Sequence, residues 1–343
     1  MTITDKSNST ILVTGASGFI GAHCVDRLLK AGYHVRAAVR SEGKFNQLAG
    51  CFDEEARSRL TPAYLSDIRN QEDVNKAVSG CEGILHVASP FSYSVSDFEK
   101  ELLNPAIEGT RTVMQAAANE PRVSRVVITS SFAAVYDATK GLQPGVVLDE
   151  TSWSPLTWDD GVKTDQAAVA YRASKVLAER EAWEFMKQND YHFDLVTLCP
   201  TMVFGPLVNP KTATCLESLN LSNQVLWSLC RGSLEDVPPT KGPVWVDVRD
   251  LADAHVRALE CPEASNQRFM MSAGDYDNQE ISDILREKLP KDFSKNIPVG
   301  TPGARLSGTH FTTNSAKAEK VLGIRFRKLE ESVLDFASQI CTQ

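Results

Sequence analysis

A glycine-rich loop close to the amino terminus constrains the fold more than any other feature of this sequence. The apolar run Ile11-Leu12-Val13 leads into Thr-Gly-Ala-Ser-Gly-Phe-Ile-Gly at residues 14–21, and a helical pattern follows. Gly15 permits a tight turn, Gly18 lets backbone approach a pyrophosphate, and Gly21 lets helix and strand pack closely. Such glycines could form a structural turn alone, but their place between a strand and a helix predicts a dinucleotide site. We assign to it Gly15, Ser17, Gly18, Phe19, Ile20 and Gly21.

Short β-branched runs then alternate with helical stretches as far as Cys199. Strands of this length separated by helices are typical of a parallel sheet that is covered on both faces. The pattern predicts an α/β fold with a doubly wound parallel sheet, of the Rossmann type. The expected strands are residues 11–13, 34–39, 63–65, 84–87, 125–128 and 193–198.

The regular alternation ends after Pro200. We expect a helix over residues 215–229, a strand over 244–248 that returns to the sheet, and a helix over 250–260. Two interleaved parts follow from this pattern. The nucleotide-binding domain takes residues 1–204 and 243–261, and a smaller substrate-binding domain takes 205–242 and 262–343.

Charge and composition exclude several classes of protein. The net charge of −8 gives no general positive field for nucleic acid or an anionic membrane. No apolar run is long enough to cross a membrane, and the start of the chain does not resemble a secretory signal, so we expect a cytoplasmic protein. The eight cysteines form no Cys-x-x-Cys pair and the histidines no helical pair, which predicts reduced, mostly buried thiols and no metal site.

The end of the second expected strand indicates which dinucleotide binds. An NAD enzyme places a carboxylate there for the ribose 2′-hydroxyl, but this chain has Arg40, with Lys44 one turn further on. Both can neutralise a 2′-phosphate, which predicts NADPH/NADP+ as the cofactor; the alternative is two solvated basic residues. Asp67, after the third strand, either meets the adenine edge or caps a helix. Two residues at later strand ends, Ala88 and Pro200, complete the predicted cofactor site.

Three polar residues are predicted to converge at the carboxyl edge of the sheet. The fifth strand ends in Thr129-Ser130-Ser131, and Tyr171 and Lys175 share one face of the next long helix. A Tyr-x-x-x-Lys spacing occurs by chance in many chains, so the surroundings decide its meaning. The residue types suit reduction of a carbonyl, because the oxygen that gains negative charge needs a proton.

The lysine explains how a tyrosine could supply that proton near neutral pH. A free phenol has a pKa of about 10. An ammonium about 4 Å away, at an effective dielectric near 20, favours the phenolate by around 4 kcal/mol, or about three pKa units at most. We therefore predict Tyr171 as proton donor, Lys175 as its activator and Ser131 as a hydrogen-bond donor to the substrate oxygen.

These motifs together resemble the extended short-chain dehydrogenases/reductases. The resemblance adds the segments at residues 86–91, 204–206, 246–250 and 297–300, and so covers nearly the whole chain. Within that family the chain is similar to the dihydroflavonol reductase and cinnamoyl-CoA reductase branch, and most to the fungal NADPH-dependent carbonyl reductases. The resemblance implies a Ser131, Tyr171 and Lys175 triad, 2′-phosphate binding by Arg40 and Lys44, and a pocket between the two domains. Family members often have a tyrosine where this chain has Met202.

Apolar residues after the expected strands are candidates for a substrate pocket, although packing alone would equally explain each of them. They are Phe91, Phe132, Tyr136, Met202 and Val203. The long connection over residues 137–163, with Trp153 and Trp158, either forms part of the pocket wall or is a surface loop anchored by its tryptophans.

Other charged or reactive residues are expected to be structural. We predict that Asp247, Arg249 and Asp250 fix a strand-to-helix corner, that the run Glu179-Arg180-Glu181 is a solvated helix face, and that Cys199 is a buried thiol.

The sequence thus predicts an NADPH-dependent reductase of small-molecule aldehydes or ketones, as monomer or homodimer. Two alternatives stay open, a nucleotide-sugar epimerase or dehydratase of the same superfamily and a non-catalytic NADP-binding regulator. A regulator has no need of Ser131, Tyr171 and Lys175 together.

Overall fold

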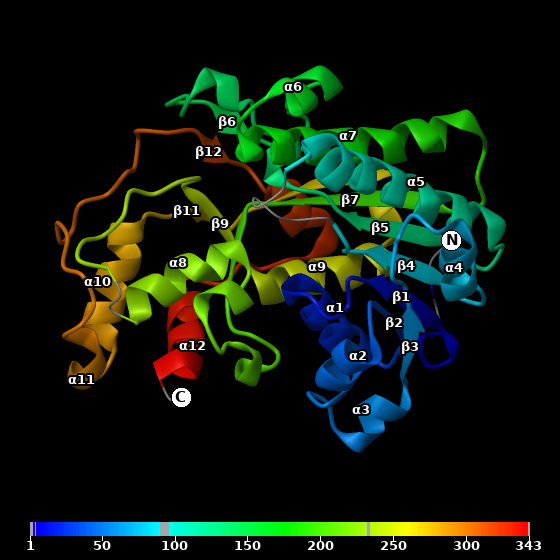
Figure 1. Cartoon of the computed structure of the whole chain (residues 1–343), viewed down its shortest axis with the longest axis horizontal. Helices are drawn as coiled ribbons and strands as arrows, with labels where there is room; N and C mark the ends of the chain where they lie inside the picture. Colours follow the sequence, from blue (N-terminus) through cyan, green and yellow to red (C-terminus); the bar gives the residue numbers. More distant parts are fainter. Residues whose placement is uncertain (1–2, 4, 90–95, 232–233, 342–343) are drawn as a thin grey trace.

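The computed structural model describes residues 3, 5–89, 96–231 and 234–341. Its centre is a seven-stranded sheet in which every neighbouring pair of strands is parallel (Figure 1). The order across the sheet is β10 (Gln267–Met271), β7 (Asp194–Pro200), β5 (Arg125–Thr129), β4 (Gly83–His86), β1 (Thr10–Thr14), β2 (His34–Val39) and β3 (Leu60–Tyr64). The predicted doubly wound α/β fold is confirmed.

Helices cover both faces of this sheet because its strands alternate their side chains between two apolar cores. Ile11 and Val13 of β1 face α1 (Phe19–Lys30) and α9 (Val248–Glu260), whereas Leu12 faces the other core. That second core is covered by α4 (Gln71–Val78), α5 (Asn104–Asn119) and α7 (Ala167–Gln188). The short helices α2 (Glu42–Ala49) and α3 (Glu54–Ser58) lie between β2 and β3 in the chain. Among the described residues, no helix is both long and apolar enough to cross a membrane.

A smaller part of the molecule has its own sheet and core. Its strands are β11 (Gly274–Asp275), β9 (Val244–Asp247) and β8 (Met202–Phe204), in that order. Phe204, Trp245 and Phe336 belong to one apolar cluster, which joins this sheet to the surrounding helices. Those helices are α8 (Leu221–Cys230), α10 (Asn278–Lys288), α11 (Lys291–Ser294) and α12 (Leu329–Cys341), grouped at one end of the molecule in Figure 1.

Two of the expected boundaries are wrong in detail. The strand expected over residues 244–248 does not return to the main sheet, because β10 already occupies the edge next to β7. It forms β9 of the small sheet instead, pairing with β8 and β11. Residues 267–271, which we expected in the substrate domain, form β10 of the nucleotide-binding sheet. The chain thus crosses between the two parts more often than predicted.

The connection over residues 137–163 is an ordered loop with short elements of its own. It contains β6 (Val147–Leu148) and α6 (Trp158–Lys163), and β6 pairs with β12 (Thr312–Thr313) from the far end of the chain. Trp158 packs against the cluster of Leu102, Leu103 and Ala170. The Trp153 ring stacks under the guanidinium of Arg268, 3.8 Å from its centroid. Both tryptophans thus anchor the loop to the main body.

Candidate active site

The glycine loop has the geometry that a dinucleotide needs. Gly15 has φ +65°, a left-handed conformation that favours glycine. A Cβ on Gly21 would lie 2.8 Å from the carbonyl carbon of Gly15, so only glycine lets α1 pack this closely on the loop. Gly18 is the N-cap of α1, and among the described residues no side chain caps that end. The first turn of α1 can therefore direct its N–H groups and dipole at a phosphate.

A buried hydrogen-bonded group joins the carboxyl ends of β1 and β4 beside this loop. The Ala88 N–H donates to Thr14 Oγ1 at 3.1 Å, and Thr14 Oγ1 lies 2.8 Å from Nδ1 of His86. Burial, helped by the nearby charge of Lys175, lowers the pKa of His86 to about 3, so the ring is neutral and can accept from the Thr14 hydroxyl. The group holds Ala88 against Gly15, where the sequence predicted a cofactor contact. We did not assign Thr14 or His86 to the site from the sequence. Both lie at the ends of strands, and this position could have pointed to them.

The predicted 2′-phosphate residues lie together after β2. Arg40 and Lys44 are both exposed, and Lys44 lies in the first turn of α2, whose N-cap is Ser41. Within the described ranges, no acidic side chain forms an ion pair with either residue. Their charges are therefore available to a phosphate, and the residue directly after β2 is Arg40 rather than a carboxylate that would repel it. The loop, the open helix end and these two cations fit NADP.

Asp67 has a different structural role from the helix cap considered above. Its carboxylate accepts hydrogen bonds from the Arg69 side chain, with Nε 2.9 Å from Oδ1 and Nη2 2.7 Å from Oδ2, and these lower the pKa of Asp67. The N-cap of α4 is Asn70. The adenine contact of Asp67 stays a prediction.

The lysine of the predicted triad is buried at the carboxyl edge of the sheet. Lys175 is 7% exposed, and its Nζ donates to the carbonyl oxygen of Thr129 at 3.1 Å and to Ser89 Oγ at 3.4 Å. Burial lowers the pKa of Lys175 to about 8, while the carboxylate of Glu179 opposes this shift. The ammonium form therefore predominates at neutral pH, and it lies beside the strand end that leads to Ser131.

Ser131 and Tyr171 are both partly exposed near this lysine. Ser131 is the N-cap of a short 3-10 helix, Phe132–Ala134, that packs against α7. Its Oγ accepts from the Ala133 N–H at 3.1 Å, which leaves its hydroxyl hydrogen to donate to another group. Tyr171 lies one turn before Lys175 on α7. The structure thus brings the elements that carry the three predicted residues together.

The run at Glu179 is not the solvated face that we expected. Glu179 is 2% exposed and forms an ion pair with Arg268 of β10, with 2.8 Å between Oε1 and Nε. Its neighbours Arg180 and Glu181 are only partly buried, which explains why the run of charges was misleading. The overlooked signal was spacing, because Glu179 follows Lys175 by four residues and shares its face of the helix.

The candidate pocket residues divide into two groups. The rings of Phe132, Tyr136 and Phe311 form a cluster with centroids 4.7 to 5.6 Å apart, and Phe311 was not predicted because it comes from a distant segment. Met202 is partly exposed, whereas Val203 is 6% exposed and packs in the core against α9. Neighbouring residues of a strand point to opposite faces, so Val203 cannot share a cleft with Met202. Phe91 lies outside the described residues.

The charged residues that we expected to be structural form a helix cap and ion pairs. Asp247 is the N-cap of α9 and pairs with Arg249, and Asp250 pairs with Arg327. Burial raises the pKa of the Cys199 thiol well above its usual range, which agrees with an inert thiol. All eight cysteines are free, and five of them are buried. The described residues hold no cluster of three or more His, Cys, Asp or Glu that could bind a metal.

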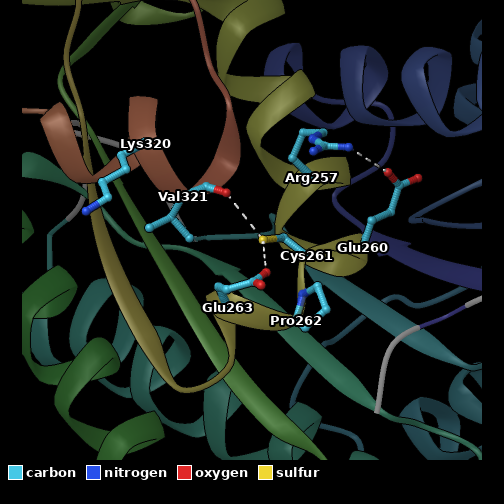
Figure 2. A pocket seen from close by; sticks show the side chains of 7 residues that line it. All are labelled: Arg257, Glu260, Cys261, Pro262, Glu263, Lys320 and Val321. Atoms are coloured by element: carbon cyan, nitrogen blue, oxygen red, sulfur yellow. Dashed lines mark hydrogen bonds and ion pairs between the residues drawn. The ribbon is translucent and has the colours of Figure 1, made fainter.

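A cavity of about 500 Å³ lies elsewhere, beyond the end of α9 (Figure 2). Cys261 stands at its centre, with its Sγ 3.2 Å from Glu263 Oε2 and 3.3 Å from the carbonyl oxygen of Val321. The carbonyl groups of Ala258 and Cys261 accept hydrogen bonds from Arg125, the first residue of β5. The cavity is therefore at the amino edge of the sheet, opposite the triad. Its lining is Arg257, Glu260, Cys261, Pro262, Glu263, Lys320 and Val321.

The doubly wound sheet, the glycine loop and the Ser131, Tyr171 and Lys175 arrangement define the class of extended short-chain dehydrogenases/reductases. The chain belongs to the NAD dependent epimerase/dehydratase family, whose model matches residues 11–274. It is 36% identical over 343 residues to the NADPH-dependent methylglyoxal reductase of Saccharomyces cerevisiae, covering 96% of this chain and 98% of that protein. It is also 36% identical to a ketoreductase of Aspergillus niger, covering 97% and 98%.

A solved structure supports the same relationship. The yeast methylglyoxal/isovaleraldehyde reductase, complexed with NADPH, matches with a TM-score of 0.88 and 34% identity, covering 97% of this chain and 98% of that one. The similarity extends over both the nucleotide-binding sheet and the smaller part of the molecule.

Proposed function

We propose that this protein reduces an aldehyde or ketone to an alcohol with NADPH. The observation that carries the proposal is the buried Lys175, which lies one turn from Tyr171 and reaches from α7 to Thr129 at the end of β5, two residues before Ser131. The relatives reported above, a methylglyoxal reductase and a ketoreductase, support the same class of reaction. The exposed Arg40 and Lys44 support NADPH over NADH.

The residues of the site divide the chemistry among themselves. NADPH, when bound along the glycine loop, supplies the hydride. Tyr171 gives its phenolic proton to the carbonyl oxygen, and Ser131 donates a hydrogen bond that holds this oxygen in place. The Lys175 ammonium stabilises the phenolate that remains on Tyr171.

The substrate side of the site is apolar. Phe132 and Tyr136 offer partly exposed aromatic rings that pack against the buried Phe311, and Met202 from β8 offers a flexible thioether. A small or aromatic carbonyl compound with little charge suits such a lining. We propose Phe132, Tyr136 and Met202 as the substrate contacts, together with Phe91 as the sequence predicted.

The experiment follows NADPH oxidation with a panel of small aldehydes, diketones, β-keto esters and aryl ketones. Turnover of several of these compounds, with a higher kcat/KM for NADPH than for NADH, supports the proposal. Interconversion of a nucleotide sugar with no carbonyl reduction would favour the epimerase alternative. Tight NADPH binding with no reaction on any compound would favour the regulator.

A cytoplasmic location and a monomeric or homodimeric state belong to the same proposal. Size-exclusion chromatography with light scattering tests the second of these.

A further inference from the structure

Behind the triad lies a buried ion pair that the proposed chemistry does not use. Glu179 follows Tyr171 by eight residues and Lys175 by four, so all three share one face of α7. Its carboxylate accepts hydrogen bonds from Arg268 Nε at 2.8 Å and Nη2 at 3.1 Å. It also accepts from Ser130 Oγ at 2.6 Å and Thr197 Oγ1 at 2.7 Å. A buried carboxylate with this many donors is fixed in place.

The ion pair holds the segment that carries Ser131 at both of its ends. Glu179 binds the hydroxyl of Ser130 at the start, and Arg268 Nη2 donates to the carbonyl oxygen of Ala134 at the end, at 3.3 Å. Arg268 Nη1 also donates to the carbonyl oxygens of Glu150 and Ser152, at 2.7 and 2.6 Å. Ser131 therefore lies between two residues that the same pair fixes.

The pair also sets the charges around Lys175. Burial disfavours the ammonium, and the carboxylate of Glu179 favours it. Besides Tyr171 on α7, the described titratable groups near this lysine are His86 from β4, which is neutral, and the thiol of Cys199 from β7. Arg268 of β10 brings a second buried cation close to Glu179, so removal of the carboxylate would leave that cation unbalanced.

We propose that Glu179, held by Arg268, is a positioning residue for carbonyl reduction, which fixes the Ser131 segment and keeps Lys175 in its ammonium form. This inference rests on the proposed function. Glu179 acts through Ser130 and Lys175 rather than by touching the substrate.

Two variants separate the two effects. Glu179→Gln keeps the size of the side chain and removes its charge, which should lower the pKa of Lys175. We therefore expect the alkaline limb of the kcat–pH profile, where kcat falls at high pH, to move to lower pH by about one unit. We also expect kcat at neutral pH to fall by roughly tenfold, with a smaller change in KM for NADPH. Ser130→Ala removes one hydrogen bond and no charge, so it should lower kcat and leave the alkaline limb in place.

The matched control is a second buried ion pair, between Arg125 and Asp194, with 2.8 Å between Nη2 and Oδ2. It joins the first residues of β5 and β7, at the edge of the sheet opposite the triad. Asp194→Asn should lower the free energy of unfolding and leave the position of the alkaline limb unchanged.

The result that overturns the inference is a Glu179→Gln enzyme with the kcat and the alkaline limb of the wild type. A limb that moves equally in Asp194→Asn also overturns it, because the effect would then be one of general stability. If Glu179→Gln does not fold, Ser130→Ala decides, and a wild-type kcat in that variant rejects the proposal.

Failure of the proposed function would be seen separately, as a wild-type protein that reduces no carbonyl. In that case the pKa of Lys175 is measured without a substrate, by acetylation with limiting acetic anhydride at a series of pH values and mass spectrometry. A lower pKa in Glu179→Gln than in the wild type supports the charge effect, and an unchanged pKa overturns it.

Discussion

The Nζ atom of Lys175 lies 3.1 Å from the carbonyl oxygen of Thr129, so a helix and a strand that are distant in sequence meet at one polar contact. Thr129 is the last residue of β5, and its own hydroxyl lies 2.6 Å from Nε2 of the buried His255. The strand end is thus fixed from both faces of the sheet, by α7 on one side and α9 on the other. This fixed point places Ser131, two residues later, beside the helix that carries Tyr171.

Replacement of the proposed proton donor should abolish most of the activity. In Tyr171→Phe we expect kcat to fall by roughly 10² to 10⁴, the contribution of general acid catalysis, with little change in the Kd for NADPH. Steady-state kinetics and quenching of protein fluorescence by NADPH measure the two quantities. Tyr191→Phe is the control, since its hydroxyl accepts from Asn189 Nδ2 at 3.2 Å just beyond the far end of α7, and its kcat should change much less. A Tyr171→Phe enzyme with full kcat would remove this residue from the mechanism.

Cofactor preference should depend on the arginine after β2. In Arg40→Ala we expect kcat/KM for NADPH to fall by roughly 10- to 100-fold while the value for NADH changes little, because only NADPH carries the 2′-phosphate. Arg57→Ala removes an arginine from α3 whose Nε contacts the carbonyl oxygen of Asp53, and it should alter neither value. Equal losses for the two cofactors in Arg40→Ala would contradict 2′-phosphate binding.

The pH dependence of the wild-type enzyme should report Lys175. Burial lowers the pKa of this lysine to about 8, so its ammonium is present below that pH and is lost as the pH rises through it. The phenolate of Tyr171 then loses its stabilising charge, and kcat/KM for carbonyl reduction should decline above about pH 8. A buffer series with constant ionic strength measures the profile. Activity that stays constant well above this pH would show that the lysine charge is not needed.

Most of the main sheet could be predicted from the sequence because its strands are short apolar runs next to strong turn signals. The bounds expected for the second strand, residues 34–39, are those of β2. β10 was missed because its sequence, Gln-Arg-Phe-Met-Met, contains a buried arginine and no β-branched residue. The partner that makes this arginine acceptable, Glu179, lies 89 residues away, and no local pattern reveals such a pair.

The residues that we propose as catalytic were easier to identify from the sequence than the residues packed around them. Ser131, Tyr171 and Lys175 follow from strand ends and helical spacing, which are local features. Phe311 reaches the aromatic cluster through a long loop, and Thr14 and His86 meet across two strands, so each depends on tertiary structure. Val203 shows the reverse error, because its position after a strand suggested a pocket although the pleat of β8 turns it into the core.

The tight contact between the glycine loop and α1 predicts a sharp difference between two glycine substitutions. In Gly21→Ala the new Cβ would lie 2.8 Å from the carbonyl carbon of Gly15 and 3.0 Å from Cα of Ala16, where only backbone could give way. We expect a loss of about 3 kcal/mol or more in the free energy of unfolding, together with weaker NADPH binding. Gly43→Ala, in α2, meets no atom within 4 Å and should raise stability by up to about 1 kcal/mol. Urea denaturation compares the two, and a stable Gly21→Ala protein would contradict this packing.

Three buried histidines should make the fold sensitive to acid. Burial lowers the pKa of His23 and His255 to about 4 and that of His86 to about 3, from an ordinary value of 6.5. Between pH 6.5 and the lowered pKa of each buried ring, the unfolded chain binds more protons than the folded one, so the free energy of unfolding decreases as the pH drops below 6.5. At pH 5 each histidine should cost on the order of 2 kcal/mol relative to pH 7. Urea denaturation at both pH values measures this difference, which should shrink in His255→Gln and stay the same in His192→Gln, where the ring is exposed. An equal acid loss in both variants would mean that carboxylates, rather than buried imidazoles, set the acid limit.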